Sequence, residues 1–225
     1  MDIGKAFTFV MDDDRWVSKI GIGALVSLLS FLIIPIPLLW GYMVGVTRNV
    51  KDGVLDPMPE WDDLGKLFMD GLAIIGAQLI YTMPFWFLTC IAGFGIVGFG
   101  SLADTSEDVA IAGLLSTFGF AICLTVLWFV ALLFISPAIV IQYVRTDSFG
   151  ALFRFGEIFS IARQNIVNIL LIMLTLFGVA VVLNIVLSIV GLIPCIGWIA
   201  VLIIGVAAGP YITVVTGHLY GQIAD

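Results

Sequence analysis

The stretch PMPEWDDLGKLFMDG, residues 57–71, is the longest polar interruption in an otherwise apolar chain. Read as a helix from Glu60, it places Trp61, Leu64 and Phe68 on one face and most of its charged residues on the other. Such a helix, with carboxylates near its N-terminus, is typical of a segment that lies in a membrane interface. We therefore expect the apolar stretches on either side of it to enter the membrane.

Composition supports this expectation. Of the 225 residues, 61% are hydrophobic and only 11% are charged, whereas a soluble domain carries about 25% charged residues. The apolar residues form long continuous runs, so the predicted fold class is an all-α polytopic membrane protein surrounded by membrane lipids. The net charge of −7 and the absence of a Lys/Arg cluster argue against a nucleic-acid partner.

The run from Val17 to Val50 decides the number of spans. Pro35 and Pro37 interrupt it, so it is either one strongly kinked helix or a hairpin of two shorter ones. A hairpin gives six spans and places all nine Lys/Arg residues on the cytoplasmic side with both termini, whereas a kinked helix gives five spans and moves three of them outside. The positive-inside rule therefore favours six spans, of which the two arms of this hairpin are the first two. The other four spans are expected at residues 72–91, 109–144, 165–192 and 196–220.

Two further segments, residues 1–15 and 145–164, have the same amphipathic pattern as residues 57–71. Each of the three precedes two spans, which suggests a pseudo-threefold repeat of an interfacial helix plus a helical hairpin within one membrane domain. The repeat units are about 1–56, 57–145 and 146–225. The candidate interfacial anchors are the large apolar side chains of these segments and of the first membrane entry: Phe7, Trp16, Trp61, Leu64, Phe68, Phe149 and Phe153.

Four stretches carry a family resemblance: MDIGKAFTFV at residues 1–10, GYMVGVTRNV at 41–50, PMPEWDDLGKLF at 57–68 and HLYGQ at 218–222. They resemble a prokaryotic family of multi-pass membrane proteins, domain of unknown function 4013. The resemblance implies a bacterial or archaeal cell-membrane protein. It implies no activity, cofactor, substrate or catalytic residue.

Small residues four apart let helix backbones approach closely in lipid. The chain has three such glycine pairs, which are used either for packing within one bundle or for a homo-oligomer interface. A further run, GFGIVG at residues 93–98, matches the dinucleotide-binding pattern, but it ends an apolar helix and has no strand before it, so close helix packing or an unwound helix end is expected instead. The three pairs are Gly41/Gly45, Gly205/Gly209 and Gly217/Gly221.

No Asp, Glu, Lys or Arg lies in the interior of a predicted span, which argues against ion pumps, proton-coupled transporters and voltage sensors. The acidic runs at residues 12–14 and 104–108 are interpreted as solvated loops. The cysteines match no metal or redox spacing, and no nucleophile–base pair is recognised, so no catalytic, cofactor or metal site is predicted. The polar groups left within spans are expected to form interhelical hydrogen bonds: Gln78, Asn168, Asn184 and His218.

These patterns predict a non-enzymatic membrane protein that acts as a homo-oligomeric scaffold or as an accessory subunit of a membrane assembly. The alternative is a transporter or passive carrier of a lipid or another apolar small molecule. A cavity near the bilayer midplane, lined by Gln78, Asn168 or Asn184, would favour the alternative. An intramembrane enzyme ranks last.

Overall fold

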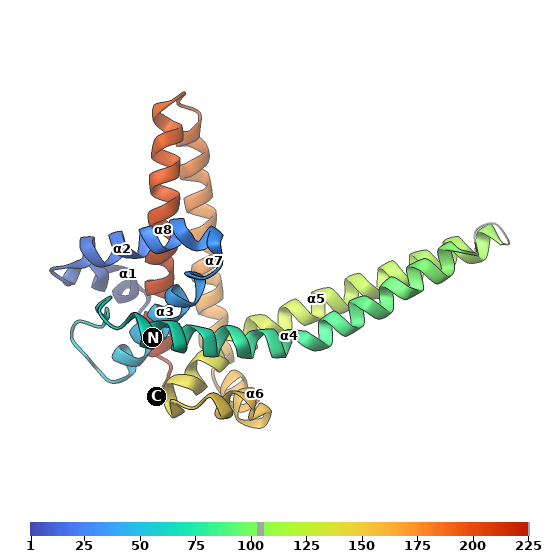
Figure 1. Cartoon of the computed structure of the whole chain (residues 1–225), viewed down its shortest axis with the longest axis horizontal. Helices are drawn as coiled ribbons and strands as arrows, with labels where there is room; N and C mark the ends of the chain where they lie inside the picture. Colours follow the sequence, from blue (N-terminus) through green and yellow to red (C-terminus); the bar gives the residue numbers. More distant parts are fainter. Residues whose placement is uncertain (103–105, 225) are drawn as a thin grey trace. The chain divides into compact units, whose positions relative to one another are not determined.

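The computed structural model describes residues 1–102 and 106–224, and every regular element in these ranges is helical (Figure 1). The all-α prediction is therefore confirmed. The elements in chain order are α1 (Ile3–Asp12), α2 (Trp16–Leu29), η1 (Ser30–Leu32), α3 (Ile36–Lys51), α4 (Leu64–Gly100), α5 (Glu107–Thr146), η2 (Phe149–Phe153), α6 (Phe155–Gln164), α7 (Ile166–Gly191) and α8 (Ile196–Gly221), where η marks a 3-10 helix.

Four of these helices, α4, α5, α7 and α8, are long and apolar enough to cross a membrane. A fifth crossing is possible if α1 and the segment Trp16–Leu32, which meet at 102°, form one broken span. Helices α2 and α3 have 14 and 16 residues. At 1.5 Å per residue they measure about 21 and 24 Å, less than the hydrocarbon thickness of about 30 Å. Six full-length spans are therefore not confirmed among the described residues, although the chain does turn between α2 and α3.

The chain breaks at the prolines that the sequence singled out. Helix α3 restarts at Ile36, with Pro35 as its N-cap and Pro37 in its first turn, where a missing amide hydrogen costs nothing. The turn before α8 is similar, because that helix also starts at an isoleucine, Ile196, after a proline-containing turn. Each turn contains one non-glycine residue with positive φ, Ile33 at 66° and Cys195 at 62°.

The expected interfacial helix at residues 57–71 is not a separate element. Residues 60–63 are not helical, and α4 begins at Leu64 and continues without a break to Gly100. The start is fixed by Asp63, whose Oδ1 accepts a hydrogen bond from the backbone N–H of Lys66 at 2.9 Å. Helix α4 therefore begins four residues later than the apolar pattern predicted. Helices α1 and α6 are the two short amphipathic helices that do form, each of 10 residues.

The chain divides into two compact units. The first contains Met1–Gly76 and the residues from Pro137 onward, and the second contains Ala77–Ser136. These limits do not coincide with the repeat boundaries expected near residues 56 and 145. In the first unit α8 packs against α1, α2, α3 and α7. The core of this unit gathers Phe9, Val10, Ile20, Tyr42, Val46, Met58, Leu67 and Val214.

The second unit is a two-helix hairpin formed by the adjoining parts of α4 and α5, which run side by side in Figure 1. A Cβ atom added to Gly113 would lie 2.1 Å from the ring of Phe99, so glycine is what lets that ring sit on α5. Gly95 faces Thr117 in the same way, at 3.0 Å. The run at residues 93–98 therefore lies inside α4, where Gly95 packs closely against Thr117, while Gly93 and Gly98 have nothing within 4 Å of an added Cβ.

Candidate functional site

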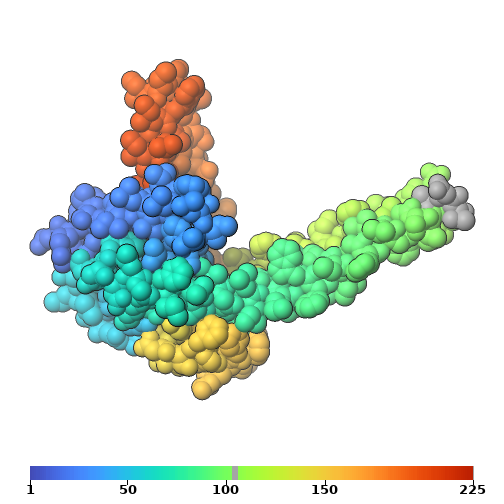
Figure 2. Space-filling model, viewed as in Figure 1, coloured from blue at the N-terminus to red at the C-terminus, as the bar shows by residue number. Residues whose placement is uncertain are grey.

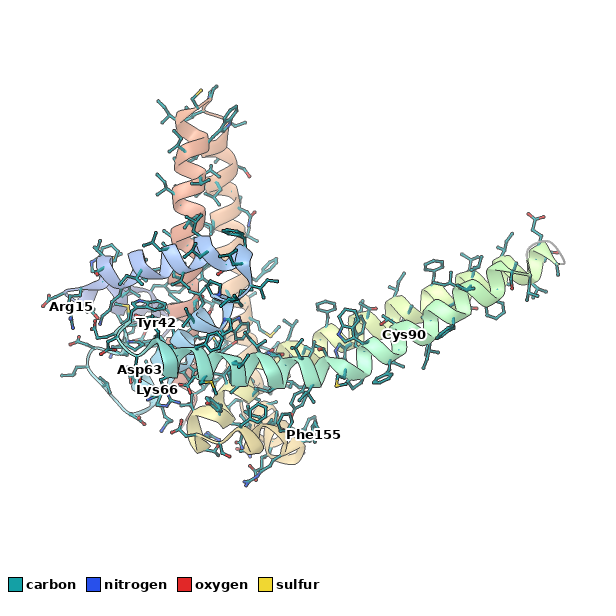
Figure 3. The ribbon with its side chains drawn as sticks, in the orientation of Figure 1. Arg15, Tyr42, Asp63, Lys66, Cys90 and Phe155 are labelled. Atoms are coloured by element: carbon teal, nitrogen blue, oxygen red, sulfur yellow. The ribbon has the colours of Figure 1, made fainter. Side chains whose placement is uncertain are left out.

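The loop between α1 and α2 contributes to a buried ion-pair network. The ammonium group of Lys19 lies 2.6 Å from Asp13 Oδ2 and 2.8 Å from Glu60 Oε1, and it donates to the carbonyl oxygen of Met58 at 2.8 Å. Arg15, labelled in Figure 3, reaches Glu60 at 2.7 Å. The Lys19 and Asp13 side chains are only 5% and 7% exposed. We call Lys19, Asp13, Glu60 and Arg15 the Lys19 network.

The loop before α4, at residues 57–63, is held by aromatic residues. The Trp61 indole N–H donates to the carbonyl oxygen of Lys19 at 3.0 Å, and its ring stacks on Tyr42 with centroids 4.3 Å apart. The Tyr42 hydroxyl donates to the carbonyl oxygen of Pro59 at 2.9 Å. Trp61, predicted as an interfacial anchor, is therefore half-buried against α3 and fastens residues 57–63 onto the first unit.

Electrostatics stabilise the charged form of Asp13. Burial by itself raises the pKa of this carboxyl. The hydrogen bonds that it accepts from the Lys19 ammonium and from the Arg15 backbone N–H outweigh burial, so the pKa of Asp13 is lowered below its ordinary value. Asp13 is thus an ionised structural group rather than a solvated loop carboxylate.

A second network joins α3, α4 and the segment after α5. Arg48 contacts Asp70 at 3.1 Å through Nη1 and Asp147 at 2.6 Å through Nη2. The Tyr143 hydroxyl donates to the other oxygen of Asp70 at 2.8 Å. Arg48, Asp70, Asp147 and Tyr143 are called the Arg48 network below. It fixes the first turns of α4 against α3, which explains why Asp70 is buried although the sequence placed it on a polar face.

A polar cavity of about 220 Å³ lies between the two networks. Its described lining carries charges of both signs but no Ser, Thr, Cys or His, so it offers no hydroxyl, thiol or imidazole group. Among the described residues no group of three or more His, Cys, Asp or Glu is arranged to hold a metal ion. Asp104, in the second acidic run, lies outside the described residues. The lining consists of Gly45, Arg48, Asn49, Pro59, Glu60, Asp62, Asp63, Lys66, Leu67 and Asp70.

A larger groove, of about 540 Å³, lies along α7 and α8 and is almost wholly apolar. Helix α1 closes one end of it, where the Tyr211 hydroxyl donates to the carbonyl oxygen of Phe7 at 2.9 Å. Gln78, Asn168 and Asn184 do not line it. We call it the apolar groove; its lining is Phe7, Leu174, Thr175, Gly178, Val179, Val182, Leu183, Val186, Ala208, Tyr211 and Ile212.

Two of the three glycine pairs pack within the chain. A Cβ at Gly41 would lie 1.7 Å from the backbone oxygen of Leu67, and Gly45 faces Pro59. Gly217 and Gly221 of α8 pack against α3 in the same manner, their Cβ positions 2.7 Å from Met43 O and 2.5 Å from Val50 Cβ. The third pair differs. Nothing lies within 4 Å of a Cβ at Gly205, and Gly209 has only the Ser27 hydroxyl oxygen at 3.5 Å.

The polar groups predicted within spans have different surroundings. Gln78 donates to the hydroxyl of Ser136 within the second unit, an interhelical bond of the kind expected. His218 is buried, stacks on Phe9 with centroids 4.2 Å apart and lies 3.0 Å from Gln222 Nε2. Asn184 is exposed and donates only to the carbonyl of its own helix, at Ala180. Asn168 is half-buried.

The remaining predicted anchors lie mostly at the surface. Trp16, Leu64 and Phe149 are exposed, and Phe68 is half-buried. Phe153 is half-buried and meets Phe149 edge to face at 5.1 Å. These side chains are spread over α2, α4 and η2 and do not converge on one site.

Sequence reasoning missed both ion-pair networks. The sequence did contain a signal for the Lys19 network. Lys19 lies three residues after Trp16 in an apolar helix, and a lysine there needs a partner when it is not at a surface. Asp70 and Arg48 carried a weaker signal, since each lies within one turn of strongly apolar residues. The partners themselves, 22 to 99 residues apart in the second network, have no local signature.

The helices and the site together define a class, the multi-pass α-helical membrane proteins. The family model described as "Protein of unknown function (DUF4013)" matches residues 25–192, and the chain belongs to that family. The match includes residues 41–50 and 57–68 but not the two terminal stretches in which a resemblance was also noted. No curated protein and no solved structure matches the chain.

Proposed function

We propose that this protein is a non-enzymatic membrane protein that acts by association, as a homo-oligomeric scaffold or as an accessory subunit of a membrane assembly. The observation that carries the proposal is that the apolar helices are largely uncovered by the rest of the chain. Only 11% of the most apolar window of α7 and 17% of that of α8 are buried. Figure 2 shows the tip of this helix pair standing clear of the rest of its unit. In lipid, uncovered helices with paired small residues can pack closely against other helices.

The use of the charged groups also supports a structural role. The Lys19 and Arg48 networks join segments distant in the sequence. Their charges are therefore engaged in holding the first unit together. The described lining of the polar cavity beside them has no hydroxyl, thiol or imidazole side chain, and this supports a proposal of association rather than catalysis.

Gly205 is the proposed centre of the contact between copies or subunits. It is half of a glycine pair, and a side chain added there meets open space within the described structure. Gly205→Phe should therefore fold normally and abolish the association by holding the partner helix away. Gly119, on α5, is an equally open helical glycine outside any pair, so Gly119→Phe is the matched control.

The measurement is mass photometry and single-molecule photobleaching in lipid nanodiscs and vesicles. We expect the wild type and Gly119→Phe to form a defined oligomer or to retain a co-purifying membrane subunit, and Gly205→Phe to lose it. A strictly monomeric wild type without a bound subunit would overturn the proposal. An oligomer that Gly205→Phe leaves intact would remove Gly205 from the interface.

A second candidate function is carriage of a lipid or another apolar molecule. The apolar groove favours it, because its size and lining suit an apolar ligand. Transfer of a fluorescent phospholipid between vesicles, with and without reconstituted protein, tests this role directly. No acceleration over protein-free vesicles would exclude it.

We further propose that α2 and α3 enter the membrane, which gives six membrane-inserted helices, both termini on the cytoplasmic side of a prokaryotic cell membrane, and the pseudo-threefold repeat. Support comes from the matching turns before α3 and α8 and from two short amphipathic helices that each precede a hairpin. A cysteine placed at Ile34, in a variant lacking the native cysteines, should react with an impermeant maleimide from outside. Reaction only from the cytoplasmic side would instead make α2 and α3 a re-entrant hairpin.

A further inference from the structure

We infer that the apolar groove holds one acyl chain of a membrane phospholipid. This inference rests on the proposal that α7 and α8 lie in a membrane, but not on oligomerisation. The first argument is the lipid environment. A groove on the exposed side of two apolar helices long enough to span a membrane is surrounded by acyl chains. No other apolar molecule is present there at a comparable concentration.

The second argument is length. The α7 side of the groove runs from Leu174 to Val186, which is about 18 Å at 1.5 Å per residue. One leaflet of the hydrocarbon core is about 15 Å thick, half of about 30 Å. A groove of this length accepts one acyl chain along its axis and is too short for a transmembrane helix of a partner.

The third argument is the closed end. Phe7 belongs to α1, an amphipathic helix, and the hydrogen bond from Tyr211 fixes α1 across the end of the groove. An amphipathic helix lies at the level of the headgroups. A chain in the groove would therefore have its ester end beside α1 and its methyl end toward the turn between α7 and α8.

The fourth argument is shape. The middle of the groove is formed by Gly178, where an added Cβ would meet nothing within 4 Å, and across it lies the small side chain of Ala208. The missing side chain at Gly178 leaves open space in the groove, whose lining also includes Leu174 and Val182. Binding there comes from close dispersion contacts, since the chain leaves one apolar medium for another.

The test uses phosphatidylcholine vesicles doped with phosphatidylcholine that carries a diazirine in the middle of one acyl chain. Reconstituted protein is irradiated, and the labelled residues are identified by mass spectrometry. We expect labelling to concentrate on the groove side of residues 174–186 and on the peptide that contains Phe7. The opposite face of α7, at Ala180, Asn184 and Ser188, is exposed and should be labelled less.

Gly178→Phe, whose Cβ meets nothing within 4 Å, places a ring in the groove and should reduce groove labelling about threefold, the effect of losing about five dispersion contacts. Gly119→Phe is again the control and should leave the labelling pattern unchanged. Equal labelling of both faces of α7, or no change in Gly178→Phe, would overturn the inference. Because Gly205→Phe reports on association and Gly178→Phe on the groove, either proposal can fail while the other stands.

Discussion

The first unit and the α4–α5 hairpin at residues 77–136 are equally helical, but they are held together by different interactions. The first unit buries charged groups, with Lys19 and Asp13 almost inaccessible and Arg48 clamped between two carboxylates. The only charged residues described in the hairpin are Glu107 and Asp108, near its tip. Its helices meet through Gly95 and Gly113 instead.

The difference shows how one apolar composition serves two architectures. A helical hairpin in lipid needs only close approach of two backbones, which glycine provides. The first unit must also hold loops and short helices that cannot satisfy all of their own backbone groups, and there the charged and aromatic side chains supply the missing partners. Polar residues therefore mark the irregular part of this fold.

The largest expected effect comes from removing the centre of the Lys19 network. Lys19→Met leaves the Asp13 carboxylate buried without its partner, so the first unit should lose about 3–5 kcal/mol of unfolding free energy. The hairpin should be unaffected. Unfolding by SDS titration in mixed micelles measures the loss.

Lys5 is an exposed lysine in no described ion pair, so Lys5→Met serves as the control. The double variant Lys19→Met/Asp13→Leu removes both buried charges and should recover part of the stability. A single variant as stable as the wild type would show that the buried pair does not hold the unit together.

Gly41→Ala should have the next largest effect on the first unit. The new methyl group would sit 1.7 Å from the backbone oxygen of Leu67, and a backbone atom cannot move aside as a side-chain tip can. We expect a loss of about 3 kcal/mol in the same titration. Gly205→Ala, in open space, should be neutral or slightly stabilising because alanine favours the helix; equal losses in both variants would contradict the packing described.

In the hairpin, Gly113→Ala should cost less, about 1 kcal/mol. The methyl group overlaps the Phe99 ring, which can rotate away, and the better helix propensity of alanine offsets part of the strain. Hydrogen exchange should become faster in residues 77–136 and stay unchanged in α1, α2 and α3. Faster exchange throughout the chain would mean that the two units are not independent in stability.

Acidification should produce the smallest loss of stability, and this loss should be confined to the first unit. Because the pKa of Asp13 is lowered in the folded protein, its contribution is fully present above its unfolded pKa of about 3.9 and is lost as pH falls through the lower folded value. The thermal midpoint measured from pH 7 to pH 3 should fall in the wild type. In Asp13→Asn the midpoint should start lower and change less; parallel curves would contradict this assignment.

The class of fold was predictable because its signal is local. Long apolar runs, the break at Pro35 and Pro37, and the amphipathic helix α1 are all written in adjacent residues. The start of α4 was predicted wrongly, because the apolar spacing from Trp61 onward suits a helix while the Asp63 cap and the stacking of Trp61 on Tyr42 favour a loop. The stacking of Trp61 on Tyr42, 19 residues earlier in the chain, outweighed the helical spacing of the apolar residues.

The site was hardly predictable for the same reason. Its groups come from loops and helix ends that meet only after folding, such as Arg48 and Asp147, 99 residues apart. Charge counting gave an expectation for the membrane side of these residues but no indication that they pair. The groove was equally hidden, because Gly178 is an ordinary glycine until α8 and α1 are placed beside it.

The packing of α8 against α1, α2 and α3 has a consequence for biosynthesis. The hydrogen bond from Tyr211 to Phe7 and the stacking of His218 on Phe9 join the first α-helix described to the last. At about 5–20 residues per second, α1 waits about 10–40 s on the ribosome before α8 is made. During that interval Phe9 lacks the His218 ring and the Phe7 carbonyl lacks the Tyr211 hydroxyl, so insertase or chaperone engagement of the nascent protein should last until α8 has been made.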